Sequence, residues 1–164
     1  MVVAHIHDKE VEQFTALGTD QKLALLWFVY EAMGDSITPA APSASTAATP
    51  IAEGLFGQVK AMSHEEQLQV QRDLIEQKNS LISREYGALS ETTKLLFWYL
   101  LAEGMTQETI IPMPDNYQLS EEASAVLETI KGLDFQEQIT LLREMVAPMG
   151  VDPNKVAHDS ETGL

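Results

Sequence analysis

The chain has 164 residues, no cysteine, and a formal net charge of −15 that comes from 25 acidic and 10 basic residues. This length is enough for one compact unit that buries about two-thirds of its unfolded surface. The absence of cysteine excludes disulfides, thiol catalysis and thiolate metal sites, and the acidic balance disfavours nucleic acids and anionic membranes as partners. No apolar run approaches the roughly 20 residues of a membrane-spanning helix. Residues 1–10 do not resemble a secretion signal, so we expect a cytoplasmic protein.

Helix signals dominate the sequence, and no alternating apolar pattern with hairpin turns predicts a sheet. The expected helices cover, in chain order, residues 8–17, 19–34, 51–62, 63–78, 80–88, 90–105, 120–132 and a last helix that begins at 134. Ser63 with Glu66, and Asp134 with Glu137, have the spacing of N-terminal capping boxes. The sequence therefore predicts an all-α fold.

Two proline-bearing crossovers, residues 35–50 and 106–117, interrupt the helices at equivalent places. From Met149 onward, glycine, proline and charged residues indicate either a frayed tail or the start of a linker. The predicted organisation is an N-terminal arm with the start of the first helix at 1–13, one domain at 14–153, and a C-terminal tail at 154–164.

Trp27 and Trp98 mark an internal repeat, because a shift of 71 positions lays the second half of the chain over the first without a gap. Pairs matched by this shift are Thr19 and Ser90, Leu25 and Leu96, Lys60 and Lys131, Glu66 and Glu137, Gln67 and Gln138, Arg72 and Arg143, and Asp73 and Glu144. The period is too long for an ordinary solenoid. It predicts two related helical halves packed face to face around a pseudo-twofold seam, where a ligand could bind.

The segments at 23–30 and 95–102 are apolar on every side, so we expect both helices to be buried all round. One interpretation is that they are the central helices of a packed bundle. The other rests on their aromatic residues, since flat rings on both sides of a symmetric seam suit a flat, extended, apolar guest. The pattern alone leaves both interpretations open.

Arg72 and Arg143 occupy equivalent positions among apolar neighbours, and their stems could lie along the seam with the guanidinium groups at its rim. An ion pair with a nearby acid, such as Glu76 or Glu144, is an equally good interpretation. We find no spacing of histidines and acids typical of a metal site, no phosphate-binding loop and no nucleophile elbow. The sequence therefore predicts no catalytic and no metal-binding residues.

Four segments resemble the N-terminal domain of the cyanobacterial orange carotenoid protein family. They are LALLWFVYEAMG at 23–34, KLLFWY at 94–99, PMPDNYQLS at 112–120 and QITLLR at 138–143. The resemblance covers about residues 14–153. It implies two discontinuous four-helix bundles with a keto-carotenoid, such as canthaxanthin, echinenone or 3'-hydroxyechinenone, threaded between them.

The resemblance also implies which side chains contact the carotenoid. By position they are Leu23, Leu26, Trp27, Tyr30, Leu95, Trp98, Tyr99, Met105, Met113, Pro114, Tyr117, Arg143 and Val146. Arg143 matches an arginine that, in the longer members, pairs with a sensory domain and takes part in docking to the phycobilisome.

Several positions depart from the family pattern. Gln71 and Arg72 replace a Met-Cys pair of the tunnel, Pro39 replaces an isoleucine, Leu96 a glycine and Thr92 an asparagine. We therefore expect a tunnel of altered shape with an extra charge near one side.

The chain ends where the family's linker to its C-terminal domain would begin, which implies a stand-alone helical carotenoid protein without a light switch of its own. The function we expect is non-enzymatic and photoprotective, namely constitutive quenching of excited states or singlet oxygen by the bound carotenoid. One alternative is docking to phycobilisomes at the thylakoid surface with loss of their fluorescence. Another is storage or transfer of carotenoid to a separate homologue of the C-terminal domain.

Overall fold

The computed structural model describes residues 8–33 and 48–154, and every element in these residues is helical. The helices are α1 (Asp8–Thr15), α2 (Thr19–Met33), α3 (Ala48–Lys60), α4 (His64–Glu76), α5 (Leu81–Gly87), α6 (Glu91–Gln107), α7 (Glu121–Lys131) and α8 (Phe135–Val146). The all-α prediction is confirmed for the described residues. No helix among them is long and apolar enough to cross a membrane.

Side-chain caps fix where the helices begin. The Ser63 and Asp134 side chains accept from the backbone N–H groups of Glu66 and Glu137, and both capping boxes are complete. The side chains of the residues before α5, α6 and α7 accept in the same way; they are Ser80, Ser90 and Ser120. Each cap satisfies a backbone N–H that has no partner within its helix. The predicted starts of α4, α6 and α8 are therefore confirmed.

Other predicted helix boundaries are less accurate. Helix α3 begins at Ala48, before the expected 51, because a proline such as Pro50 is tolerated in the first helical turn. Helix α6 continues to Gln107 and stops where Glu108 adopts a left-handed conformation, with φ at 64°. The first crossover, with Pro39, lies mostly outside the described residues.

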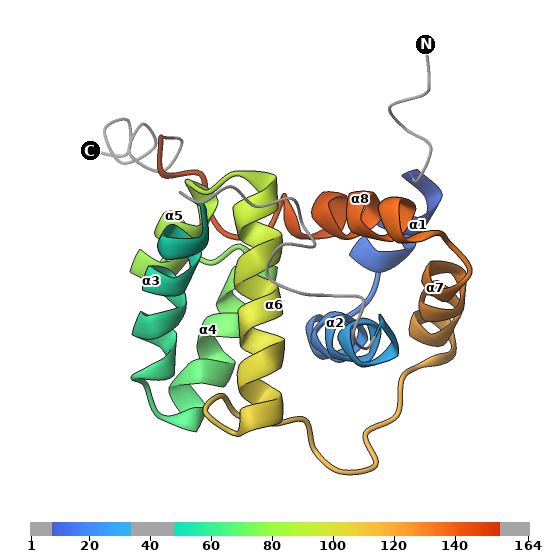
Figure 1. The fold of residues 1–164 in the computed structure, drawn as a ribbon, viewed down its shortest axis with the longest axis horizontal. Helices are drawn as coiled ribbons and strands as arrows, with labels where there is room; N and C mark the ends of the chain where they lie inside the picture. Colours follow the sequence, from blue (N-terminus) through green and yellow to red (C-terminus); the bar gives the residue numbers. More distant parts are fainter. Residues whose placement is uncertain (1–7, 34–47, 155–164) are drawn as a thin grey trace.

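The helices pack in two groups of four (Figure 1). Helices α3, α4, α5 and α6 pack together, as do α1, α2, α7 and α8, and the 71-residue shift relates α1–α4 to α5–α8. Each group therefore combines two helices from one half of the repeat with two from the other. Contacts of α2 with α4, of α6 with α8, and of α2 with α6 join the two groups, so the central helices lie at the seam.

The two central helices differ in burial. Every residue from Leu95 to Ala102 on α6 is at most 8 % exposed, as predicted. On α2 only Ala24, Leu25 and Val29 in the apolar segment are buried. The expectation that both segments are buried all round is wrong for α2, because this helix turns its aromatic side to a pocket and not to packed side chains.

The residues after α8 are held in place. The Gly150 N–H donates to the Leu74 carbonyl at 2.8 Å, and the Val151 N–H donates to the Ser83 carbonyl at 3.0 Å. Gly150 has φ at 77°, which favours glycine, and a Cβ there would lie 2.6 Å from the Tyr86 ring. The prediction of fraying is therefore wrong for residues 149–151, because these bonds attach them to α4 and α5, whereas residues 155–164 lie outside the described part of the chain.

Candidate functional site

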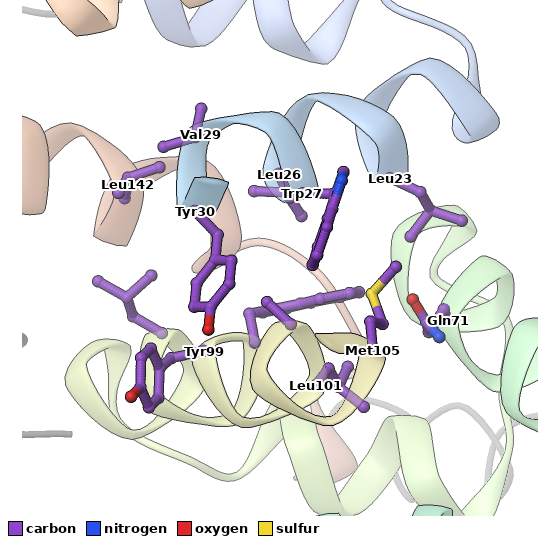
Figure 2. A pocket seen from close by; sticks show the side chains of 13 residues that line it. Leu23, Leu26, Trp27, Val29, Tyr30, Gln71, Tyr99, Leu101, Met105 and Leu142 are labelled. Atoms are coloured by element: carbon purple, nitrogen blue, oxygen red, sulfur yellow. The ribbon is translucent and has the colours of Figure 1, made fainter. Parts of the chain in front are cut away.

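An apolar pocket lies at the seam between the two groups (Figure 2). We call it the seam pocket. Its lining residues come from α2, α4, α6 and α8, and they are Leu23, Leu26, Trp27, Val29, Tyr30, Gln71, Leu95, Trp98, Tyr99, Leu101, Ala102, Met105 and Leu142. Both halves of the repeat therefore contribute walls.

Helix α2 supplies one aromatic wall, which is open on one side. The rings of Trp27 and Tyr30 stack with centroids 5.6 Å apart and planes 30° apart. Tyr30 also meets Tyr99 of α6 across the seam at 5.8 Å. Trp27 and Tyr30 are partly exposed, so this wall offers aromatic surface to whatever enters the pocket.

Helix α6 supplies the opposite wall, and hydrogen bonds hold it rigidly. The Trp98 indole N–H donates to the Tyr86 hydroxyl at 2.9 Å, and that hydroxyl donates to the Val146 carbonyl at 2.7 Å. Burial raises the pKa of Tyr86 well above its usual value, so it remains a neutral donor. This chain from α6 through α5 to α8 fixes the plane of the Trp98 ring.

Tyr99 extends the rigid wall. Its hydroxyl donates to the Glu103 carboxylate at 3.2 Å, one helical turn further along α6. Burial, with the negative charge of Glu103, raises the pKa of Tyr99 to about 12. Its hydroxyl hydrogen is therefore directed toward Glu103.

A second pocket adjoins the first beneath the second crossover. We call it the crossover pocket. It shares Leu23, Gln71 and Met105 with the seam pocket, and its further lining residues are Asp20, Ala24, Leu68, Arg72, Ile111, Pro112, Met113, Pro114 and Tyr117. The two pockets adjoin at these three shared residues, and we call them together the slot.

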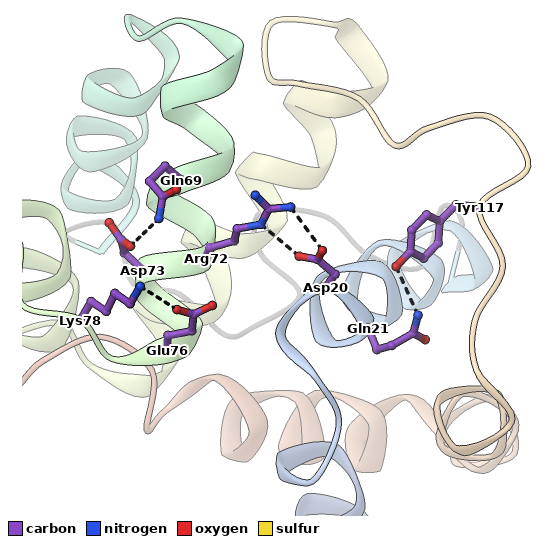
Figure 3. A network of polar contacts seen from close by, with 8 residues as sticks. All are labelled: Asp20, Gln21, Gln69, Arg72, Asp73, Glu76, Lys78 and Tyr117. Carbon is purple, nitrogen blue, oxygen red and sulfur yellow. Dashed lines mark hydrogen bonds and ion pairs between the residues drawn. The ribbon is translucent and has the colours of Figure 1, made fainter.

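Polar contacts hold the crossover against α2 (Figure 3). The Gln21 amide donates to the Tyr117 hydroxyl at 3.2 Å, and its carbonyl accepts from the Ser120 N–H at 2.8 Å. Arg72 of α4 forms a two-point ion pair with Asp20 of α2, at 3.0 and 3.2 Å. This pair joins the two groups of helices at the edge of the crossover pocket.

The ion pair corrects one prediction and refines another. The partner of Arg72 is Asp20 and not Glu76, although Glu76 also helps to raise the pKa of Arg72. The expected extra charge does lie beside the slot, but the carboxylate opposite balances it. Arg143 is partly buried and donates to the Thr92 hydroxyl at 3.4 Å.

The structure brings together most of the residues selected from the sequence. Eight line the seam pocket, namely Leu23, Leu26, Trp27, Tyr30, Leu95, Trp98, Tyr99 and Met105. Met113, Pro114 and Tyr117 line the crossover pocket. Val146 is fully buried behind the rigid wall, and neither it nor Arg143 lines either pocket.

Some lining residues were not selected from the sequence. They include Val29, Leu101, Ala102 and Leu142 in the seam pocket and Ile111 and Pro112 in the crossover pocket. The repeat held a usable signal, because the 71-residue shift carries Tyr30 onto Leu101 and Gln71 onto Leu142. No group of three or more acidic or histidine residues that could hold a metal ion occurs within the described part of the chain.

These features define an all-helical domain with an aromatic slot between two groups of helices, suited to a long apolar ligand. The family model described as "Orange carotenoid protein, N-terminal" matches residues 1–152. The chain belongs to the orange carotenoid protein N-terminal domain family, whose members are non-enzymatic carotenoid-binding proteins.

Curated relatives include an orange carotenoid-binding domain-containing protein of Nostoc sp., 55% identical over 140 residues, which cover 85% of this chain and 81% of the relative. The orange carotenoid-binding protein of Synechocystis sp. is 39% identical over 94% of this chain. This chain spans 48% of that longer relative.

Two solved structures are similar to this chain over most of its length. The Red Carotenoid Protein of Anabaena (Nostoc) sp., solved with canthaxanthin bound, has 52% identity and a TM-score of 0.77, with 88% of this chain and 98% of that chain covered. The Orange Carotenoid Protein of the same organism, also binding canthaxanthin, has 42% identity and a TM-score of 0.82 over 93% of this chain and 48% of that one.

Proposed function

We propose that this protein binds a keto-carotenoid in the slot formed by the seam and crossover pockets. Its photoprotective role is to let the bound carotenoid quench excited states or singlet oxygen. The observation that carries the proposal is the aromatic seam pocket, with Trp27 and Tyr30 on one wall and Trp98 and Tyr99 on the other. Canthaxanthin bound to the similar Red Carotenoid Protein supports the choice of ligand.

The residues of the slot fit such a ligand. Ring faces and aliphatic side chains give dispersion contacts along a flat apolar molecule, and Met105, which lines both pockets, can adapt to its shape. Tyr86 holds Trp98 in one orientation, whereas the partly exposed Trp27 can adjust. The conjugated chain of a bound carotenoid supplies low-lying states that accept excitation and release it as heat.

We further propose that quenching by this chain needs no light-dependent step. The aromatic walls and the pocket between them are formed by α2, α4, α6 and α8 in the structure. Singlet-oxygen lifetimes measured in the dark-adapted and illuminated holoprotein test this point. Equal quenching is expected, and quenching that appears only after illumination would contradict it.

Expression in a carotenoid-producing host tests the ligand directly. The wild type should be purified as an orange or red protein with a visible absorption band. Leu26→Trp, which fills the seam pocket from its partly exposed wall, should lower the bound carotenoid severalfold. Leu81→Trp is the matched control, because Leu81 is 59% exposed on α5 and lines neither pocket. A colourless wild type in a host that contains keto-carotenoid would rule out the proposal.

Docking to the phycobilisome is a second candidate, favoured by the partly exposed guanidinium of Arg143 beside Thr92. A chain of net charge −15 is repelled by an acidic antenna unless local basic residues bind it, so docking should be salt-dependent. Phycobilisome fluorescence with the holoprotein added at low and moderate salt tests this, and unchanged emission in both rules it out. A colour change on mixing with a C-terminal-domain homologue would instead indicate carotenoid transfer.

A further inference from the structure

Gln71 of α4 places an unpaired hydrogen-bond donor in the slot. The residue is 4% exposed, and its Nε2 has no hydrogen-bond partner among the described residues. Gln71 lines both the seam pocket and the crossover pocket, and Figure 2 shows its amide beside Met105. A buried donor without an acceptor is unfavourable in a folded protein, so this amide calls for an explanation.

A glutamine one turn earlier on the same helix shows what a structural amide looks like here. Gln67 is 1% exposed, and its Nε2 lies within 3.5 Å of four backbone carbonyls, including that of Thr109 at 3.1 Å. Its Oε1 accepts from the Ile111 N–H at 2.8 Å. Gln67 thus connects the start of the second crossover to α4, whereas the Gln71 Nε2 donor has no acceptor among the described residues.

Packing does not require an amide at position 71. The 71-residue shift carries Gln71 onto Leu142, which is also buried and also lines the seam pocket. A leucine therefore serves on one side of the pseudo-twofold seam, and an amide stands on the other. The slot is polar at one place and apolar at its repeat equivalent.

Three other polar side chains at the slot have hydrogen-bond partners. The Trp98 indole donates to Tyr86, and the Tyr99 hydroxyl donates to Glu103. The Tyr117 hydroxyl accepts from Gln21. Ser83 Oγ is also buried without a partner, but Ser83 lies on α5 and lines neither pocket. Among the described residues, a fully buried polar atom without a partner therefore coincides with the slot only at Gln71.

From these observations we infer that the Gln71 amide donates a hydrogen bond to an oxygen on one end ring of the bound carotenoid. The inference rests on the proposed function and narrows it in two ways. The slot prefers carotenoids with a ring ketone over hydrocarbon carotenoids, and a carotenoid with a single ketone binds with that ring toward α4. One net hydrogen bond corresponds to a preference of about two- to tenfold.

Competition between echinenone, which has one ketone, and β-carotene, which has none, tests the preference. Both are offered to the colourless protein in equal amounts, and the bound ratio is measured after extraction. In Gln71→Leu the ratio of echinenone to β-carotene should fall about two- to tenfold with total bound carotenoid retained. Gln69→Leu, the same substitution at an exposed position of α4 that lines neither pocket, is the matched control and should keep the wild-type ratio.

Vibrational spectroscopy tests the hydrogen bond in the wild type without relying on a variant. The ketone stretch of bound echinenone should lie below its frequency in an apolar solvent. The shift should disappear in Gln71→Leu and persist in Gln69→Leu. An unshifted ketone stretch in the wild type, or a wild-type ratio in Gln71→Leu, would overturn the inference while leaving carotenoid binding intact. A wild type that takes up neither carotenoid would overturn the proposed function, and this inference with it.

Discussion

The two halves of the repeat, α1–α4 and α5–α8, share a framework and differ at the slot. Both halves have a complete capping box, at Ser63 and Asp134, in equivalent positions. In both, the glutamine on the following helix donates to an equivalent carbonyl, Gln67 to Val59 and Gln138 to Ile130. The apolar segment 95–102 of α6, however, is buried on every side, whereas most of the segment 23–30 of α2 is only partly buried.

This difference indicates separate roles for duplicated helices. Trp98 on α6 is fixed by the Tyr86 hydroxyl, whereas its equivalent Trp27 on α2 is partly exposed and stacks on Tyr30. One wall of the slot is therefore rigid and the other adjustable. A rigid wall can fix the orientation of a ligand, and an adjustable one can let it enter.

The largest difference in stability between equivalent substitutions in the two halves is expected for the two tryptophans. Trp98→Ala should lower the free energy of unfolding by about 3 to 5 kcal/mol, because it leaves a cavity in packed surroundings. Trp27→Ala should cost about 1 kcal/mol, since part of that ring is already exposed. Urea denaturation of the colourless protein measures both.

Carotenoid yield completes the comparison of the two tryptophans. Both variants should retain less pigment than the wild type, because both rings line the seam pocket. If Trp98→Ala lowered stability and left carotenoid yield unchanged, Trp98 would be a core residue without contact to the ligand. Equal losses of stability in the two variants would contradict the rigid and adjustable walls.

The equivalent glutamines Gln67 and Gln138 should differ less in their contribution to the free energy of unfolding. Gln67→Leu should cost about 3 kcal/mol, because it leaves the Ile111 N–H and the Thr109 carbonyl without their partner. Gln138→Leu should cost about 1 kcal/mol, since Gln138 is only partly buried and makes the single bond to Ile130 common to both halves. Thermal unfolding of both variants measures the difference, and similar losses would argue against a special role of Gln67 at the crossover.

Much of the framework follows from local sequence. Caps such as Ser90 and Asp134 depend on a side chain and a backbone N–H three residues away, so the sequence contains all of the information. The correspondence between α1–α4 and α5–α8 follows from the 71-residue shift. Helix ends were predicted less well, since the left-handed turns at Gln77 and Glu108 occur at residues with no strong preference for them.

The slot was only partly predictable, because burial depends on neighbours that are distant in sequence. The aromatic composition of residues 23–30 and 95–102 is nearly the same, yet only the second segment is enclosed. The pairing of Arg72 with Asp20, 52 residues away, was likewise not evident. The resemblance selected residues by position, so it included Val146, which lies behind Trp98 and does not line the slot.

Alkaline pH should affect the second half more than the first. Burial raises the pKa of Tyr86 well above 10.0 and that of Tyr99 to about 12. The equivalent residues in the first half, Thr15 and Phe28, do not titrate in this range.

The sign of the effect follows from proton binding. Above pH 10 the unfolded chain releases these protons while the folded chain keeps them, so stability is complete below about pH 10 and falls as the pH rises toward the folded values. Each tyrosine contributes roughly 1 kcal/mol per pH unit. Urea denaturation between pH 8 and about 11 should show the loss in the wild type and a smaller slope in Tyr86→Phe. An equal slope in the two proteins would contradict the assignment to Tyr86.

The smallest effect on stability is expected for the Arg72–Asp20 pair, which joins the adjustable wall to α4. Its side chains are 38% and 56% exposed, so Arg72→Ala should change the free energy of unfolding by no more than about 0.5 kcal/mol. The pair nevertheless lies at the edge of the crossover pocket and connects the two groups of helices. Carotenoid transfer from the holoprotein to lipid vesicles should therefore be about twofold faster in Arg72→Ala.

High salt should give the wild type the same faster transfer, because it screens an exposed ion pair, and should not change the variant further. Lys131→Ala is the matched control, since its pair with Glu128 at 3.3 Å lies within α7 and joins no second helix. If Lys131→Ala accelerated transfer as much as Arg72→Ala, the effect would come from net charge. If neither did, carotenoid would leave the slot at a place other than the edge that Asp20 and Arg72 close.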